Sequence, residues 1–145
     1  MSDAEFYASA MAGLPSLIAR WLEIGDASPD RLGIILADTA RIAKLGEPAT
    51  DPDGATLARW ATAAVEADRP PLWAVKATLF LLSQMPARPC PQDDAQRDGW
   101  AWAWLRLRRW ESYEQARDAL PSWLLEALGE HLQRAWRDRQ RQRLL

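Results

Sequence analysis

Apolar side chains recur along most of the chain at the three- and four-residue steps that place them on one face of a helix. The first such stripe consists of Leu14, Leu17, Ile18, Trp21 and Leu22. The strict alternation and the turn residues that mark β-hairpins are otherwise missing. The pattern therefore predicts an all-α fold, a single-domain bundle of about five to seven helices.

Capping residues indicate where the N-terminal helices begin and end. Pro15 suits the first turn of a helix, so residues 3–12 are expected to form a separate short helix before it. Ser28 is a good N-cap and Gly46 a good C-cap, which predicts a helix between them. The buried face of this helix is expected to contain Leu32, Ile35, Leu36, Thr39, Ile42 and Ala43.

Prolines divide the rest of the chain. A loop over 47–54 precedes a third amphipathic helix, and the segment Leu72–Leu82 is apolar nearly all round, which predicts a helix at the centre of the core. Three prolines exclude a helix over 86–94. Two long helices are expected after this loop, over 95–119 and 121–141.

The length of 145 residues corresponds to one domain. We therefore expect residues 1–145 to form a single helical domain. Residues 1–85 hold the N-terminal helices, 86–94 form the Pro-rich loop, and 95–145 hold C-terminal helices rich in tryptophan and arginine.

Tryptophan is unusually frequent, with nine residues in the chain and six of them after residue 99. The run from Trp100 to Trp110 alternates and could be a strand, but Ala, Leu and Arg favour a helix. In helical projection one face is apolar and belongs to the core. The opposite face carries Trp102, Arg106, Arg109, Tyr113 and Arg117.

A row of alternating aromatic and guanidinium groups is typical of surfaces that bind partner proteins, phosphates or single-stranded bases. The alternative is that Trp102 packs under a neighbouring helix with the arginines over it, paired with nearby carboxylates. If the row is a binding surface, reversing the charges of Arg106 and Arg109 should weaken partner binding with little change in stability. On the last helix, the residues that we assign to the same partner surface are Trp123, Arg134, Arg137 and Arg141.

The nine tryptophans divide between core and surface in this projection. Trp73 lies in the helix that is apolar all round, and Trp102 and Trp123 fall on the arginine-bearing faces. The tryptophans expected on buried stripes are Trp21, Trp60, Trp100, Trp104, Trp110 and Trp136.

Charge is distributed unevenly. Residues 1–99 have 9 basic and 14 acidic side chains, whereas residues 100–145 have 9 basic and 6 acidic ones. The arginines near the end of the last helix can stabilise that helix by interacting with its dipole. Alternatively, they can bind an acidic protein or nucleic acid. The excess of arginine over lysine and the abundant alanine are typical of a GC-rich bacterial or phage gene.

The residues needed for most catalytic and metal sites are scarce. One cysteine (Cys90) and one histidine (His131) exclude an internal disulfide and a Cys/His zinc site. We expect Cys90 to be an exposed thiol and His131 a packed, hydrogen-bonded histidine. The carboxylates that we interpret as helix N-caps are Asp51, Asp53, Asp93, Asp94 and Asp98. With no Gly-rich phosphate loop, the sequence predicts neither an enzyme nor a metal or cofactor site.

No segment has the length or composition of a membrane span or a signal peptide. The longest apolar run is Leu79–Leu82, and residues 1–12 contain no basic side chain. We therefore expect a cytoplasmic protein with no membrane contact.

Two classes of function fit these observations. The first is a non-enzymatic interaction protein, such as an adaptor, inhibitor, immunity or assembly subunit, that binds another protein or a multi-subunit complex. The second is a small helical subunit that contacts nucleic acid in a ribonucleoprotein or DNA-processing complex. The low pI of 5.4 favours the first class, and the sequence is also compatible with a homo-oligomer.

Overall fold

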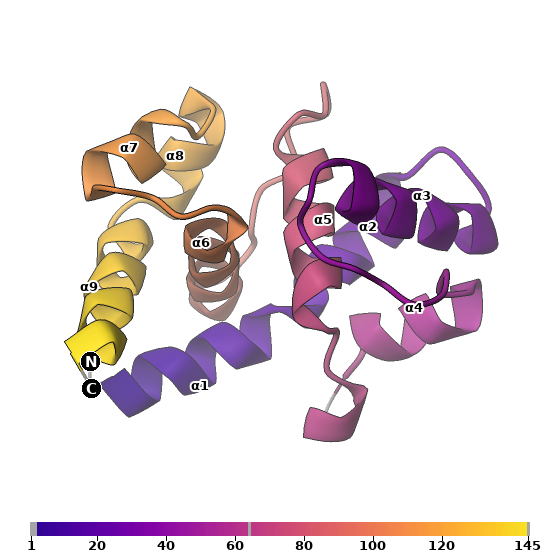
Figure 1. Ribbon diagram of the computed structural model, residues 1–145, viewed down its shortest axis with the longest axis horizontal. Helices are drawn as coiled ribbons and strands as arrows, with labels where there is room; N and C mark the ends of the chain where they lie inside the picture. The colour runs from indigo at the N-terminus through magenta and orange to yellow at the C-terminus, as the bar shows by residue number, and fades with distance from the viewer. Residues whose placement is uncertain (1–2, 64, 145) are drawn as a thin grey trace.

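The computed structural model describes residues 3–63 and 65–144, and helices occupy most of this length (Figure 1). In chain order the elements are α1 (Asp3–Gly13), α2 (Pro15–Ile24), α3 (Pro29–Ile42), α4 (Gly54–Ala61), the short 3₁₀ helix η1 (Glu66–Asp68), α5 (Leu72–Leu82), α6 (Asp94–Leu107), α7 (Tyr113–Asp118), α8 (Ser122–Leu128) and α9 (His131–Leu144). Within the described residues no β-strand occurs. The predicted all-α class is confirmed, although the helices are more numerous than expected.

Both long C-terminal helices predicted from the sequence are broken. After α6 the backbone of Arg108 is extended, with φ −142° and ψ 174°. A new helix, α7, then begins where the Ser112 hydroxyl accepts a 3.0 Å hydrogen bond from the backbone N–H of Gln115. The second break is at Gly129, whose φ of +53° favours glycine and separates α8 from α9. The strand interpretation of Trp100–Leu107 is wrong, since this segment is helical.

The N-terminal helices α2 and α3 begin where their predicted capping residues indicate, but the predicted end of α3 is wrong. Ser28 caps α3, and its hydroxyl accepts a hydrogen bond from the backbone N–H of Arg31. The predicted C-cap is wrong: α3 ends at Ile42, the residue with positive φ is Lys44, and Gly46 instead packs against Trp73.

The buried face of α3 also differs from the predicted one. Ile42 is 83% exposed, whereas Gly33, Ala37 and Ala40 are buried. Leu32 and Leu36 are buried as predicted, and the small residues beside them let the backbone of α3 approach its neighbours closely. A pattern analysis that counts only large apolar residues misses these small members of the buried face.

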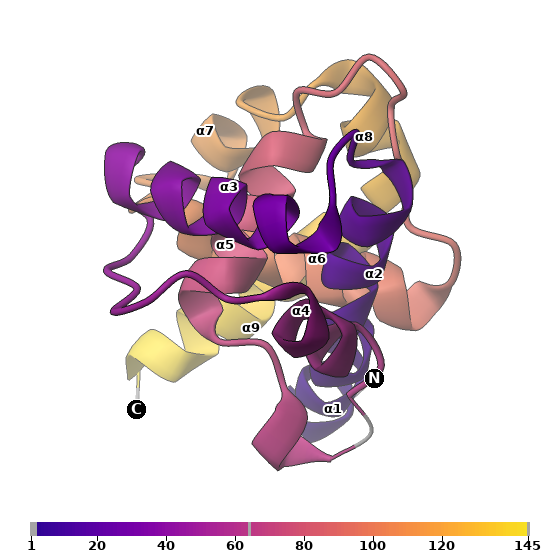
Figure 2. The same cartoon turned by 90° about the vertical axis from the view of Figure 1, so that its right-hand side faces the viewer.

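The helices form two groups that share one core (Figures 1 and 2). On one side α6 packs between α1 and α9, with α7 and α8 above them in Figure 1. On the other side α2 and α3 pack against α5, and α4 packs against α2 and α3. α5 contacts both α3 and α6, which places it at the centre as predicted. At the crossing of α1 and α6, a Cβ at Gly99 would lie 2.8 Å from the carbonyl oxygen of Ala10, so only glycine permits this approach.

A single hydrophobic cluster runs from Phe6 to Ala135. As predicted, Trp21, Trp100, Trp104 and Trp110 are buried in it. The remaining five tryptophans are partly buried and pack against it: Trp60, Trp73, Trp102, Trp123 and Trp136. Trp60 and Trp136, which were expected to be buried, therefore keep some exposure. Trp102 and Trp123, which were expected on the arginine-bearing faces, contact the core. None of the helices in the described ranges has the length and apolar character needed to cross a membrane.

Candidate functional site

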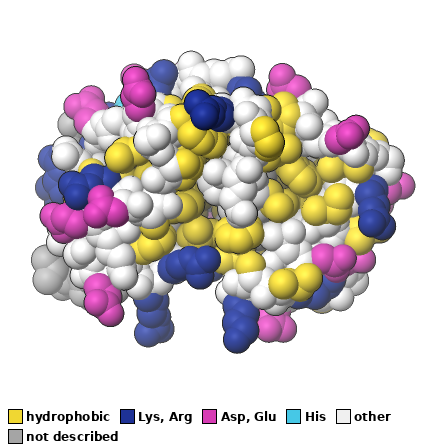
Figure 3. All heavy atoms as spheres, turned by 90° about the horizontal axis from the view of Figure 1, so that it is seen from above, with side chains coloured by type: hydrophobic (Ala, Val, Ile, Leu, Met, Phe, Trp, Pro, Cys, Tyr) yellow, Lys and Arg dark blue, Asp and Glu magenta, His cyan; other side chains and the backbone are white. Residues whose placement is uncertain are grey.

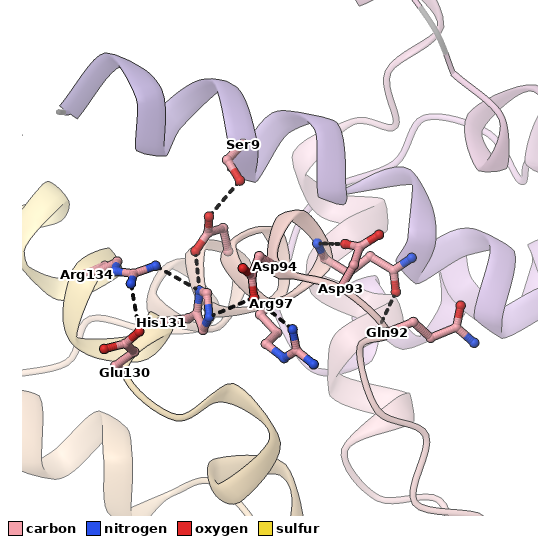
Figure 4. A network of polar contacts seen from close by, with 10 residues as sticks. Ser9, Gln92, Asp93, Asp94, Arg97, Glu130, His131 and Arg134 are labelled. Carbon is pink, nitrogen blue, oxygen red and sulfur yellow. Dashed lines mark hydrogen bonds and ion pairs between the residues drawn. The ribbon is translucent and has the colours of Figure 1, made fainter. Parts of the chain in front are cut away.

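A buried carboxylate joins three helices near the crossing of α1 and α6 (Figure 4). Asp98 of α6 is fully buried, and its Oδ2 accepts a 2.6 Å hydrogen bond from the Ser9 hydroxyl of α1. Its Oδ1 lies 2.6 Å from Nδ1 of His131, the first residue of α9. The other ring nitrogen of His131 lies 3.5 Å from a carboxylate oxygen of Asp94. Both oxygens of Asp98 therefore have close partners, as the burial of a carboxylate requires.

Serine, aspartate and histidine meet in this network, but in an order that differs from a nucleophilic triad. In a triad the histidine lies between the other two and takes the serine proton. Asp98 instead lies between Ser9 and His131, so His131 is not placed to activate the hydroxyl. The network ties α1, α6 and α9 together, and His131 is the packed, hydrogen-bonded histidine that the sequence predicts.

The N-capping interpretation of the carboxylates holds for two of the five. Asp53 accepts the backbone N–H of Thr56 at 2.8 Å, and Asp93 accepts that of Gln96 at 2.8 Å. Asp98 does not cap a helix but lies inside the fold, a role that the sequence did not reveal. The remaining two bind arginines: Asp51 pairs with Arg41, and Asp94 pairs with Arg97.

Trp102 and Arg106 lie one turn apart on α6, in the seam with α9. The guanidinium carbon of Arg106 is 3.8 Å from the centroid of the Trp102 ring. Arg106 donates hydrogen bonds to the Trp102 carbonyl at 3.2 Å and to Oε1 of Gln142 in α9 at 3.1 Å. Trp102 Nε1 is buried and has no hydrogen-bond partner in the part of the chain that the structure describes. This arrangement resembles the packing alternative in that Trp102 lies in a helix seam with Arg106 over it, but the hydrogen bonds of Arg106 go to a carbonyl and an amide oxygen and not to a carboxylate.

Burial also changes the electrostatics of Arg106. Loss of solvent lowers the pKa of its guanidinium to about 10, and repulsion from Arg139 adds to this shift. Attraction to the buried Asp138 opposes it. Arg106 remains charged at neutral pH, but it is engaged within the fold. This burial leads us to expect that reversing the charge of Arg106 lowers stability, in contrast to the small change in stability expected from the sequence for reversing Arg106 and Arg109 together.

The structure does not place the five predicted residues of the first row on one helical face. α6 ends before Arg109, which is exposed, while Tyr113 and Arg117 belong to α7. Because the helix is broken over 108–112, Tyr113 and Arg117 do not continue the face of α6 that carries Trp102 and Arg106. Tyr113 instead contacts Trp136 of the last helix, and Arg117 lies over the Tyr113 ring.

Tyr113 and Trp136 meet across α7 and α9 and form the floor of a groove. Their rings make an edge-to-face contact, with centroids 6.1 Å apart and an interplanar angle of 66°. The groove has a volume of about 380 Å³ and is completed by Gln133 and Arg137. We call it the Tyr113–Trp136 groove.

One arginine lines this groove, and two others lie over its aromatic rings. Arg117 lies over Tyr113, with its guanidinium carbon 5.9 Å from the ring centroid, and Arg139 lies 4.8 Å from that of Trp136. Arg137 lines the groove, is exposed, and makes no hydrogen bond or ion pair with the other residues that the structure describes. Asp118 partly neutralises Arg117 through a 3.0 Å contact, which raises the pKa of that guanidinium. The groove therefore combines aromatic rings with a positive rim.

The other predicted partner residues of the last helices lie apart from the groove lining. Trp123 of α8 packs partly buried against the core. Arg134 donates a 2.7 Å hydrogen bond to Glu130, as the four-residue spacing predicts, and Arg141 is exposed near the end of α9. Sequence projection placed Trp136 in the buried stripe and therefore missed its part in the groove.

The upper side of the molecule, as Figure 1 is oriented, carries charges of both signs. In Figure 3, which views the molecule from the upper side of Figure 1, lysine and arginine side chains are interspersed with carboxylates and apolar groups. Extended contact with a phosphate backbone favours a continuous basic face. The described side chains on this side of the molecule do not form one.

Two further observations complete the description of the site. In the described ranges no cluster of three or more histidine, cysteine or carboxylate side chains could hold a metal ion. Compared with known proteins, the chain matches no family model, and no curated protein or solved structure is significantly similar to it. The chemistry of the groove is therefore what indicates a function.

Proposed function

We propose that this chain is a non-enzymatic protein-binding protein, an adaptor, inhibitor, immunity or assembly subunit of bacterial or phage origin. Its partner offers an acidic segment with an apolar side chain that enters the Tyr113–Trp136 groove. The observation that carries the proposal is the pairing of two half-buried aromatic rings with Arg137, an exposed cation that no described residue neutralises.

The composition of the groove suits protein recognition. Tryptophan, tyrosine and arginine are the residues most enriched among those that dominate binding energy at protein interfaces. A volume of about 380 Å³ accommodates one or two side chains of a partner. Carboxylates on the partner would pair with Arg117 and Arg137 at the rim, which favours orientation and a fast encounter.

A site-specific photocrosslinker tests this proposal directly. A photoreactive phenylalanine analogue at Gln133, which lines the groove and is exposed, is expected to form discrete protein adducts in cells of the native host. The adducts should disappear when Arg137→Glu is added. The same analogue at Gln84, exposed after α5, is the matched control and should give none of these adducts. Adducts that form equally at both positions would contradict the proposal.

The second candidate function is contact with nucleic acid. It is favoured by the placement of Arg117 over Tyr113 and of Arg139 over Trp136, because sites that combine arginine with aromatic rings also bind unpaired bases. A labelled single strand should then bind at low salt and dissociate steeply as salt increases. Adducts at Gln133 that nuclease treatment removes would support this candidate instead of the first.

A further inference from the structure

In the other helical group the loop between α3 and α4 crosses α5 (Figure 2). Residues of this loop, of α4 and of α5 line a second cavity. Its volume is about 390 Å³. Two tryptophans line it, Trp60 of α4 and Trp73 of α5, together with the carboxylates Asp51 and Asp53 and the exposed Thr50. No described residue of its lining is a lysine or an arginine.

The loop that forms one wall is fixed at several points. Its Pro52 carbonyl packs directly on Gly33 of α3, where any larger residue would collide with it. Asp30 of α3 accepts a 2.7 Å hydrogen bond from the backbone N–H of Gly54. Arg41 donates to the Pro48 carbonyl at 3.3 Å. The cavity is therefore held open by the fold and needs no rearrangement to receive a ligand.

The two tryptophans offer aromatic surface to this cavity. Their ring centroids are 6.0 Å apart and their planes are inclined by 81°, so the contact uses the face of only one ring. Both side chains are partly buried, which limits the water that would compete with a ligand. The face of an indole attracts cations more strongly than that of any other side chain.

Carboxylates exceed cations around the cavity. Arg41 bridges Asp38 and Asp51, at 3.1 and 3.0 Å, so one guanidinium serves two carboxylates. Asp53 accepts the Thr56 N–H, a hydrogen bond that holds its pKa below the ordinary value, with a smaller effect from the charge of Arg59. Asp30 adds a further carboxylate beside the loop. The local field therefore favours a positive ligand.

We infer that the cavity between Trp60, Trp73 and the 47–53 loop is a binding site for an organic cation, an ammonium or guanidinium group on an apolar body. The indole rings would contact the cation and its alkyl groups, and Asp51 and Asp53 would supply the opposite charge. The ligand is a free small molecule or an arginine or methylated lysine side chain of a peptide, since these share the same chemistry. The site is separate from the Tyr113–Trp136 groove and does not depend on its function.

NMR spectra of the intact chain test the inference. The indole N–H signals of Trp60 and Trp73, assigned by comparison with the Phe variant at each position, are followed during titration. One arm uses choline and its uncharged isostere 3,3-dimethyl-1-butanol. The other uses a capped Gly-Arg-Gly peptide and the same peptide with citrulline, the uncharged isostere of arginine. We expect saturable shifts with a cation and at least about fivefold weaker binding of its neutral isostere.

A charge variant at the exposed Thr50, which lines the cavity, tests the inference without disturbing the packed core. Thr50→Lys places a competing cation beside the cavity and should weaken binding at least about fivefold, whereas Thr50→Gln should not. Glu126→Gln on α8 changes the net charge by the same amount at a distant exposed site and should have no effect.

The arms also separate the sources of the ligand. Saturation by choline alone identifies a free cation, and saturation by the arginine peptide alone identifies a side chain. Absence of indole shifts with both cations at tens of millimolar, equal binding of the neutral isosteres, or equal weakening by Glu126→Gln would overturn the inference.

Discussion

Replacing Asp98 by alanine removes the group that connects α1, α6 and α9. The side chain of Asp98 is fully buried and makes two contacts of 2.6 Å, to the Ser9 hydroxyl and to the His131 ring. The variant leaves both partners without this carboxylate in a buried site. We expect this single change to destabilise the fold far more than removal of the exposed Asp94 carboxylate on the same helix.

The size of the effect follows from the two contacts. A hydrogen bond to a charged group contributes about 1.5 to 3 kcal/mol, and the carboxylate no longer has to be buried in the variant, which offsets part of the loss. Removing one partner from a buried, hydrogen-bonded pair costs about 3 to 5 kcal/mol, and we expect Asp98→Ala to lie in this range. That is a large part of the 5 to 15 kcal/mol by which domains are typically stable.

Urea unfolding followed by tryptophan fluorescence measures this loss. Asp94→Ala is the matched control on the same helix, because its carboxylate is 80% exposed and lies 3.5 Å from His131. The control should lose less than about 1 kcal/mol. Ser9→Ala, which removes one of the two contacts of Asp98, should fall between them. If Asp98→Ala and Asp94→Ala were equally stable, or if a double-mutant cycle between Asp98 and His131 showed no coupling, the assignment of the network as a structural tie would be refuted.

Three further predictions concern separate features of the fold. Arg106→Glu should destabilise the chain by about 2 to 4 kcal/mol because it places a carboxylate in the α6–α9 seam, whereas the exposed Arg109→Glu should change stability by less than about 0.5 kcal/mol; urea unfolding compares the two. Gly129→Ala should cost about 1 to 3 kcal/mol in the same assay because its φ of +53° is unfavourable for alanine, and an unchanged midpoint would contradict this account of the α8–α9 break. Asp53→Ala should lower the thermal midpoint at neutral pH, because the hydrogen bond from the Thr56 N–H stabilises the ionised carboxylate and lowers its pKa. The difference should begin to shrink as the pH falls to about 3.8 and should vanish once the pH is below the lowered pKa of Asp53; a difference that is undiminished at the lowest pH would argue against the capping bond.

Sequence patterns predicted the helices whose ends carry their own local signals. Ser28 and Pro15 mark the starts of α3 and α2 because a cap or a first-turn proline acts through neighbouring backbone groups. The apolar Leu72–Leu82 segment lies at the centre because it has no polar face to turn outward. Such features depend on a few adjacent residues and are readable without the fold.

The breaks at 108–112 and at Gly129 were missed for a different reason. Ser112 and Gly129 are residues that cap helices, but the apolar periodicity continues across both of them and suggests uninterrupted helices. Burial of Trp110, whose Nε1 donates to the Trp104 carbonyl at 3.0 Å, folds the intervening segment back on α6. The periodic pattern therefore predicts correctly that residues such as Trp110, Leu120 and Leu132 are buried, but it predicts uninterrupted helices where the structure has breaks.

The candidate site was predictable in composition but not in arrangement. Tyr113, Arg117 and Arg137 were expected at a partner surface, and the structure brings them together around one groove. Trp136 joins them only because α7 and α9 lie side by side, which residue spacing does not encode. The role of Arg106 was also hidden, since an arginine on a helical face looks the same whether the face meets solvent or α9.

Affinity capture from the native host tests the proposed function most directly. The wild-type chain is compared with the double variant Arg117→Glu/Arg137→Glu, and with Arg31→Glu, an exposed arginine on α3, as the control. Losing an arginine that anchors an interface costs about 1 to 2 kcal/mol or more, so the double variant should retain at least about tenfold less of a specific protein partner. Capture should persist after nuclease treatment and in the Arg31→Glu control. Equal capture by all three chains, or capture that nuclease abolishes, would contradict the proposal that this groove binds a protein.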